Sequence, residues 1–116
     1  MEDDRWPVDW LRAGLPLLVL AALSRGEAHG YALLQRLRDS GLTDIRGSTV
    51  YPLLTRQQQL GRLGSRWEHA SAGPAKKVFF LTDEGRVELA RIGREWRRFA
   101  RLVESATADP AEQEQT

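Results

Sequence analysis

The side chains best suited to chemistry in this chain are hydroxyls and cations in its middle third. Ser48, Thr49 and Tyr51 can hydrogen-bond to base edges or phosphate oxygens, and Arg56 follows one to two helical turns later. From residue 46 to residue 77 the sequence holds six cations and one carboxylate, Glu68. A local positive surface of this kind suits a polyanion, although a charged face exposed to solvent is the simpler explanation of the charge alone.

No catalytic or metal-binding arrangement can be assembled from the other reactive residues. The chain has no cysteine, which excludes disulfides, thiol catalysis and cysteine-based zinc sites. Its histidines, His29 and His69, have no acid partner at a fixed spacing, and Ser48 and Ser65 lack the context of a nucleophile elbow. No glycine-rich phosphate loop is present. We therefore expect neither an enzyme nor a bound cofactor or metal.

Length and composition predict one globular domain with a single core. The chain has 116 residues, of which 41% are hydrophobic and 28% are charged. Its net charge of +1 conceals acidic termini, because carboxylates dominate residues 1–9 and 109–116. The longest apolar stretch, residues 15–23, is about half of what spans a bilayer, and no cleavable leader opens the sequence. We expect a cytoplasmic protein without membrane contact.

Apolar residues between Trp10 and Leu23 predict a first helix that is central to the core. Pro16 interrupts this pattern. It either begins the main helix at its first turn or kinks a helix that begins near Pro7, and we favour the first interpretation.

Two shorter helices are predicted next. The second opens at residues 29–31 and ends at residues 40–41, with leucines recurring every three to four residues. In the third, Ser48 or Thr49 can cap the free N–H groups, and Pro52 lies in or just after the first turn, where it is tolerated. Gly61 is expected to end this helix in the left-handed conformation.

The pattern changes to that of strands after Gly64. Residues 65–69 alternate, residues 71–74 form a break, and residues 78–82 run extended, which predicts a β-hairpin with Lys76 and Lys77 at its tip or flank. Trp67 is expected to pack this hairpin onto the domain.

The last predicted helix carries a heptad pattern. Thr82 is expected to cap it, and Asp83 and Glu84 suit its positive end. Apolar side chains then recur at spacings of 3 and 4 residues between flanking arginines, which is typical of a coiled-coil seam. We expect this seam to join two copies of the chain. Its residues are Leu89, Ile92, Trp96, Phe99 and Val103.

Helices joined by a short turn and followed by a lysine-bearing hairpin form the winged helix-turn-helix arrangement. The predicted fold is therefore mainly α with a small β-hairpin (α+β), a winged helix-turn-helix with a C-terminal dimerisation helix. The third helix fits the major groove of DNA, and the hairpin lysines reach a neighbouring minor groove or the backbone. The predicted DNA-binding residues are Tyr31, Ser48, Thr49, Tyr51, Arg56, Lys76 and Lys77.

The predicted organisation has four parts. Residues 1–9 form a flexible acidic N-terminus and residues 10–82 the DNA-binding domain. Residues 83–106 form the dimerisation helix, and residues 107–116 a disordered tail.

Several blocks of this sequence, in this order, resemble the PadR family of transcriptional regulators. The similarity spans residues 10–105, and the order and spacing of the blocks are more specific than any one of them. A single helix after Gly85 resembles the smaller PadR subfamily, whose members dimerise through their terminal helices. The matching blocks are His29-Gly30-Tyr31, residues 48–54, Leu60-Gly61, residues 65–68 and residues 73–85.

The resemblance implies a repressor that binds an inverted repeat as a homodimer, often with ATGT and ACAT half-sites, and that a small-molecule effector releases. The sequence departs from the family pattern at residues 47–51, at residues 57–59, where a charged stretch is usual, and at residues 78–80, where tyrosines are common. These departures concern the operator sequence more than the fold.

Trp96 has two interpretations. It is an aromatic residue of the dimer core, or two symmetry-related Trp96 rings sandwich a planar aromatic effector, as in some small PadR regulators. The residues predicted to bind an effector in the second case are Trp96, Leu89, Ile92, Phe99 and Trp10.

Two other functions remain open at this point. A winged-helix protein-interaction module would use the basic face to bind an acidic protein, whereas a constitutive nucleoid-like binder would hold DNA without effector control. Steep salt dependence of duplex binding separates the repressor from the interaction module. A sequence preference separates it from the constitutive binder.

Overall fold

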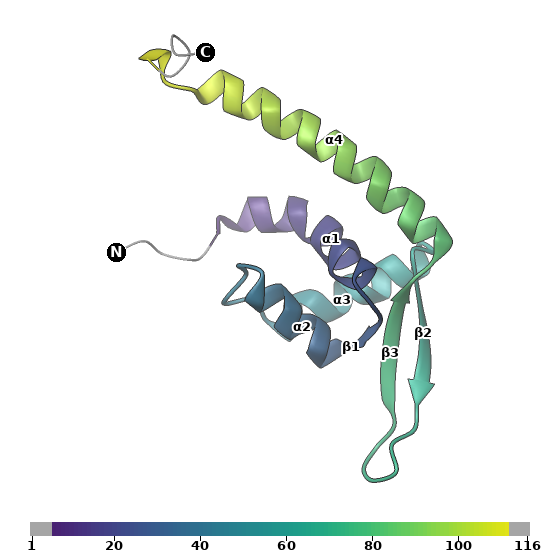
Figure 1. Cartoon of the computed structure of the whole chain (residues 1–116). Coiled ribbons are helices and arrows are strands. Elements are labelled where there is room, and N and C mark those ends of the chain that lie inside the picture. Colours follow the sequence, from purple (N-terminus) through teal and green to yellow (C-terminus); the bar gives the residue numbers. More distant parts are fainter. Residues whose placement is uncertain (1–5, 112–116) are drawn as a thin grey trace.

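The computed structural model describes residues 6–111, which form four helices and a three-stranded antiparallel sheet (Figure 1). The predicted class, mainly α with a small β-hairpin, is confirmed. Residues 1–5 and 112–116, in the segments expected to be flexible and disordered, lie outside the described residues. The helices are α1 (Val8–Ser24), α2 (Gly30–Asp39), α3 (Gly47–Gln59) and α4 (Asp83–Thr107), and the strands are β1 (Ala28–His29), β2 (Leu63–Glu68) and β3 (Lys76–Leu81).

Helix α1 corrects our interpretation of Pro16. The helix begins at Val8 and continues through Pro16 to Ser24, so its start lies within the segment expected to be flexible. Pro16 has no N–H for the carbonyl one turn earlier, and α1 bends along its length in Figure 1. One side of the helix buries four large apolar side chains, each worth about 1.5–3 kcal/mol, which outweighs one missing hydrogen bond. They are Leu15, Val19, Leu20 and Leu23.

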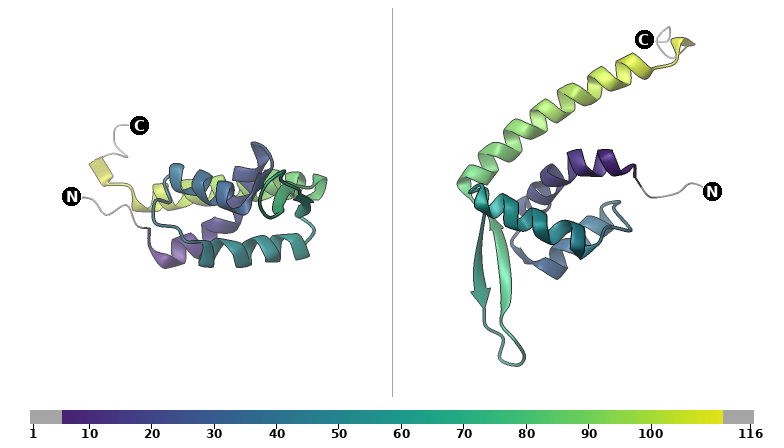
Figure 2. Two further views of the ribbon diagram at one scale, coloured as in Figure 1. Left: turned by 90° about the horizontal axis from the view of Figure 1, so that it is seen from below. Right: turned by 180° about the vertical axis from the view of Figure 1, so that it is seen from behind.

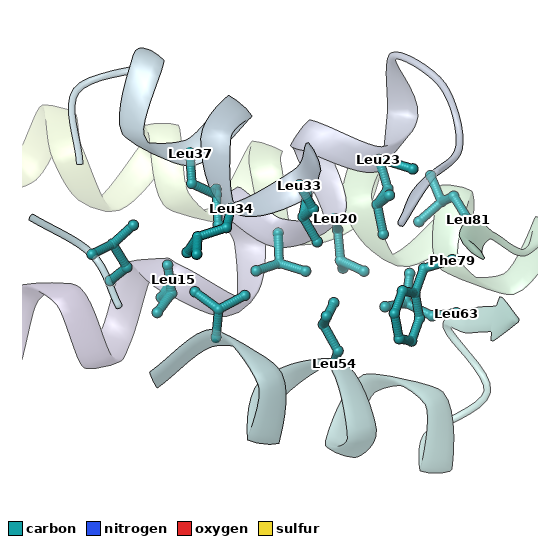
Figure 3. Packing of buried hydrophobic residues seen from close by; sticks show 14 of the residues in the cluster. Leu15, Leu20, Leu23, Leu33, Leu34, Leu37, Leu54, Leu63, Phe79 and Leu81 are labelled. Atoms are coloured by element: carbon teal, nitrogen blue, oxygen red, sulfur yellow. The ribbon is translucent and has the colours of Figure 1, made fainter. Parts of the chain in front are cut away.

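The core lies where α1, α2 and α3 meet the inner face of the sheet (Figure 3). Leu33 and Leu37 of α2 and Leu54 of α3 are almost completely buried against α1, while Phe79 and Leu81 close the core from β3. Among the described residues, every buried polar side-chain atom has a hydrogen-bond partner. Helices α1, α2 and α3 are therefore fixed relative to one another by one continuous apolar cluster.

The ends of the helices follow the predictions in part. Thr82 caps α4, because its hydroxyl accepts from the N–H of Gly85 at 3.0 Å, and Gly61 has the expected positive φ of 80°. The prediction for α3 is wrong: the capping position is Arg46, and neither Ser48 nor Thr49 caps the helix. Pro52 is the sixth residue of α3 and thus lies beyond its first turn.

The sheet has the order β1-β3-β2, and β1 was not predicted from the sequence. The hairpin pairs Leu63 with Leu81 at its base and Glu68 with Lys76 near its tip. It projects from the body of the molecule (Figure 1). A β-carbon on Gly64 would lie 2.4 Å from the ring of Phe80, so the cross-strand ring requires glycine at this position.

Helix α4 is anchored at its start and extends away from the body (Figures 1 and 2). The Thr82 hydroxyl donates to the carbonyl of Gly61 at 2.7 Å, and the Thr82 N–H donates to the carbonyl of Arg62 at 3.1 Å. The guanidinium of Arg62 also lies 3.3 Å from the carboxylate of Glu88. The start of α4 is therefore bonded directly to the end of α3.

Within residues 6–111, no helix combines the length and apolar character needed to span a bilayer.

Candidate nucleic-acid interface

Four of the seven predicted DNA-binding residues line one surface hollow of about 500 Å³ between α2, α3 and β3, which we call the α2–α3–β3 hollow. None of its lining residues, all of which the structure describes, carries a carboxylate. Seen from behind, α3 crosses the front of the molecule and the hairpin projects from the end where α3 finishes (Figure 2). The lining residues are Tyr31, Tyr51, Lys76, Lys77, His29, Gly30, Leu54, Thr55 and Phe79.

Tyr51 is held between the starts of two helices. A β-carbon on Gly47 would lie 2.6 Å from Cε2 of its ring, and one on Gly30 would lie 3.1 Å from Cε1. These two glycines therefore form a slot that admits the ring edge. Tyr51 remains 44% exposed, so the residue is packed between the two glycines and is also open to solvent.

Tyr31 lies on the first turn of α2 and is largely exposed. Its hydroxyl accepts a hydrogen bond from the Gln35 side chain at 3.0 Å, which leaves the hydroxyl proton available to an incoming acceptor. The side chain of His29 accepts from the N–H of Ala32 at 3.3 Å, so this histidine caps α2.

The remaining three predicted residues, Ser48, Thr49 and Arg56, are exposed on α3. The first turn of α3 contains no acidic residue, and the first N–H groups of any helix lack acceptors within it. The start of α3 therefore presents donors without a neutralising carboxylate, an arrangement that favours phosphate oxygens.

The basic segment identified in the sequence divides into two groups. Arg66 forms two hydrogen bonds with Glu27, at 2.6 and 2.5 Å, and Arg62 pairs with Glu88 at 3.3 Å. The bonds from Arg66 hold the pKa of Glu27 below its ordinary value. Across residues 6–111, no carboxylate lies within 4.0 Å of the other four cations, which are Arg46, Arg56, Lys76 and Lys77.

Two more arginines have structural roles that the sequence analysis missed. Arg36 donates to the carbonyls of Ala22, Gly26 and Glu27, and Arg38 donates to the carbonyl of Ile45 at 3.0 Å. These bonds hold α2 to the end of α1 and to the segments on either side of α2. Nothing in the spacing of the residues indicates them, because the acceptors are backbone carbonyls far away in the sequence.

The expectation that Trp67 packs the hairpin onto the domain is wrong, because the residue is 64% exposed.

The predicted seam of α4 is divided between the core and the surface. Leu89 packs against the core, and the Trp96 ring lies over α1, where a β-carbon on Gly14 would be 3.6 Å from it. Phe99 and Val103 lie farther along α4 and are exposed. Trp10 is one turn before Gly14 and contacts Trp6, with ring centroids 6.5 Å apart. The Trp96 side chain of α4 therefore contacts α1, the helix that carries Trp10.

Comparisons with known proteins agree on one family. A family model described as "Transcriptional regulator PadR-like family" matches residues 19–91. A PadR family transcriptional regulator from Eggerthella lenta is 33% identical, with a TM-score of 0.79 over 87% of this chain and 88% of that one. A PadR-like transcriptional regulator from Bacillus cereus is 27% identical, with a TM-score of 0.78 over 87% and 98% of the two chains.

The Bacillus subtilis PadR protein, solved in complex with operator DNA, is 26% identical. The match has a TM-score of 0.60 over 66% of this chain and 45% of that one. No curated protein matches the chain. Among residues 6–111, no group of three or more metal-ligating side chains is present.

Proposed function

Because the chain belongs to the PadR-like family, whose members are transcriptional regulators and not enzymes, we propose that it represses transcription as an operator-bound homodimer that a small molecule releases. A cytoplasmic, nucleoid-associated location follows from this function. Residues 10–82 would bind DNA and residues 83–106 would dimerise.

The observation that carries the proposal is the α2–α3–β3 hollow. It gathers two tyrosines and two unpaired lysines from three elements and contains no carboxylate. The exposed side of α3 adds Ser48, Thr49 and Arg56. With α3 in the major groove, the hairpin extends toward the adjacent minor groove and brings its lysines to the phosphates.

Dimerisation is supported by the distal half of α4. The helix has 25 residues and is thus about 37 Å long, and its distal half presents Phe99, Leu102 and Val103 to solvent. A twofold pairing along this face would cover these side chains and place two copies of α3 in successive major grooves. An inverted-repeat operator follows from that symmetry.

An effector site between the two copies is supported by the aromatic residues near α1. Trp10 lies on α1, the Trp96 ring of α4 lies against the same helix near Gly14, and both side chains are partly exposed. A planar aromatic molecule between the two copies would contact Trp96, Ile92 and Phe99 of each. It would lower operator affinity by binding more tightly to the arrangement of α4 helices that does not fit DNA.

Duplex binding at several salt concentrations tests the DNA-binding function. Arg56→Ala and Lys77→Ala should each weaken binding. Each substitution removes one phosphate contact from both copies of the dimer, so it should reduce the slope of log K against log salt by about 1.8, at about 0.9 per contact. Arg98→Ala is the matched control, because Arg98 lies on α4 and pairs with Glu95. Absence of salt-dependent binding in the wild-type chain would favour the protein-interaction module instead. Equal affinity for all sequences would favour the constitutive binder.

A further inference from the structure

Trp67 is a large aromatic residue that nothing in the described chain covers. It is 64% exposed, and among residues 6–111 no ring lies against its indole and no acceptor receives its indole N–H. Leaving so large an apolar ring in water is unfavourable. Aromatic residues exposed in this way are enriched where another molecule binds.

The alternation of side chains along β2 places Trp67 on the side of the hairpin that faces α3. Leu63 is buried in the core, and the hydroxyl of Ser65 accepts from the Gln58 side chain of α3 at 2.9 Å. Trp67 follows at the same spacing of two and thus shares this face. At about 3.3 Å per residue, it lies roughly 13 Å from Leu63 toward the tip of the hairpin.

The two faces of the hairpin carry different charges. Trp67 is paired in register with Lys77, whose ammonium lies 5.4 Å from the centre of the Phe79 ring. Arg66 and Lys76 alternate to the opposite face. There the carboxylates of Glu27 and Glu68 lie beside Arg66. The face that bears Trp67 therefore combines an uncovered ring with an unpaired cation. A polyanion is the partner that this charge distribution favours.

We propose that Trp67 is a further DNA contact, packing its indole against the sugar rings along the minor groove beside the major groove that α3 occupies, while Lys77 binds an adjoining phosphate. This inference rests on the DNA-binding function proposed above. Apolar side chains are used against minor grooves by many DNA-binding proteins. Because the indole carries no charge, its contribution to affinity should not depend on salt, unlike that of Lys77.

The effect can be measured by fluorescence anisotropy with a labelled duplex that the wild-type chain binds. Covering about a third of a tryptophan side chain, on the order of 60 Å² of ring, corresponds to roughly tenfold in affinity. Trp67→Ala should therefore bind about tenfold more weakly per copy, or about a hundredfold for a dimer that makes the contact twice. Its salt slope should be that of the wild type, and Trp67→Phe should recover most of the loss. Val8→Ala removes an equally exposed apolar side chain from the start of α1 and should bind like the wild type.

Two further measurements separate a DNA contact from a structural effect. Because Trp67 is exposed, Trp67→Ala should melt at the wild-type temperature. The difference in acrylamide quenching between the wild type and Trp67→Phe should shrink when duplex is added, since DNA would cover the ring.

Equal binding by Trp67→Ala and the wild type, within twofold, overturns this inference and leaves the proposed function intact. A reduced salt slope in Trp67→Ala also overturns it, because the variant would then act by displacing Lys77. If the wild-type chain binds no duplex at low salt, the proposed function itself fails.

Discussion

Replacing Gly47 by alanine should test how the DNA-binding face is built. The added β-carbon would lie 2.6 Å from Cε2 of Tyr51, so the ring must move by about 0.8 Å to reach an ordinary contact of 3.4 Å. Such a displacement pushes the side chain off its rotamer at a cost of about 0.5–1.5 kcal/mol. Alanine also favours the helix by up to about 1 kcal/mol relative to glycine. The two effects nearly cancel, so Gly47→Ala should change the free energy of unfolding by less than about 1 kcal/mol.

The opposing effects separate in a double-mutant cycle. In a Tyr51→Ala background the clash disappears, so the added alanine should only stabilise the chain. The coupling energy between the two substitutions, measured by urea unfolding at one protein concentration, should be about 1 kcal/mol. Duplex affinity should fall about tenfold in Gly47→Ala alone, as Tyr51 loses its place beside the phosphates. Gly93→Ala is the control, because its β-carbon meets only the flexible end of Arg97, at 3.4 Å.

A coupling energy below about 0.3 kcal/mol, the range of additivity for independent sites, would refute the slot formed by Gly30 and Gly47. Unchanged duplex affinity in a Gly47→Ala chain with the expected coupling would show that Tyr51 packs there without touching DNA.

Three more predictions concern the supports of this face. Gly85→Ala would place a β-carbon 2.1 Å from the Arg62 carbonyl oxygen. Urea unfolding should therefore show that the free energy of unfolding falls by about 3 kcal/mol or more. A fall of less than about 1 kcal/mol would contradict the close packing of α4 on Arg62. The bonds from Arg66 lower the pKa of Glu27 from 4.5. The Glu27–Arg66 pair therefore stabilises the fold fully above pH 4.5, and this stabilisation is lost as the pH falls through the lowered pKa. The melting temperatures of the wild type and Glu27→Gln should thus differ most above pH 4.5 and converge as the pH falls below it, and a constant difference would contradict the pairing. Phe99→Glu should shift the sedimentation coefficient from that of a dimer toward that of a single copy, and an unchanged dimer would exclude the distal part of α4 as the interface.

The sequence predicted those parts of the fold that local chemistry decides. Thr82 caps α4 because threonine followed by acidic residues suits a helix start, and Gly61 ends α3 because a positive φ favours glycine. The hairpin was predicted from the alternation of its side chains, although β2 begins at Leu63 and β3 at Lys76, each two residues before the expected start.

The errors arise where tertiary packing overrides local preference. Pro16 remains inside α1 because the apolar side chains around it are buried, a property that a window of sequence does not contain. Strand β1 has two residues, too few for any periodicity to show. Trp67 was expected to be buried because it is apolar, but the hairpin extends beyond the core at its position.

The candidate site was predictable as a set of residue types and not as a set of contacts. Hydroxyls and cations indicated the segment proposed to bind DNA, and the structure brings Tyr31, Tyr51, Lys76 and Lys77 to one hollow. Which cations remain unpaired depends on partners far away in the sequence. Arg66, for example, meets Glu27 across 39 residues, so its charge could not be assigned from the basic segment alone.

Selection of bound fragments from random duplex DNA tests the central claim most directly. The wild-type chain should enrich a twofold-symmetric motif whose half-sites lie about 10 base pairs apart, centre to centre. A chain that carries both Arg56→Ala and Lys77→Ala should show no enrichment. Recovery of no motif by the wild type, or of a single half-site without its inverted copy, would contradict binding to an operator as a homodimer.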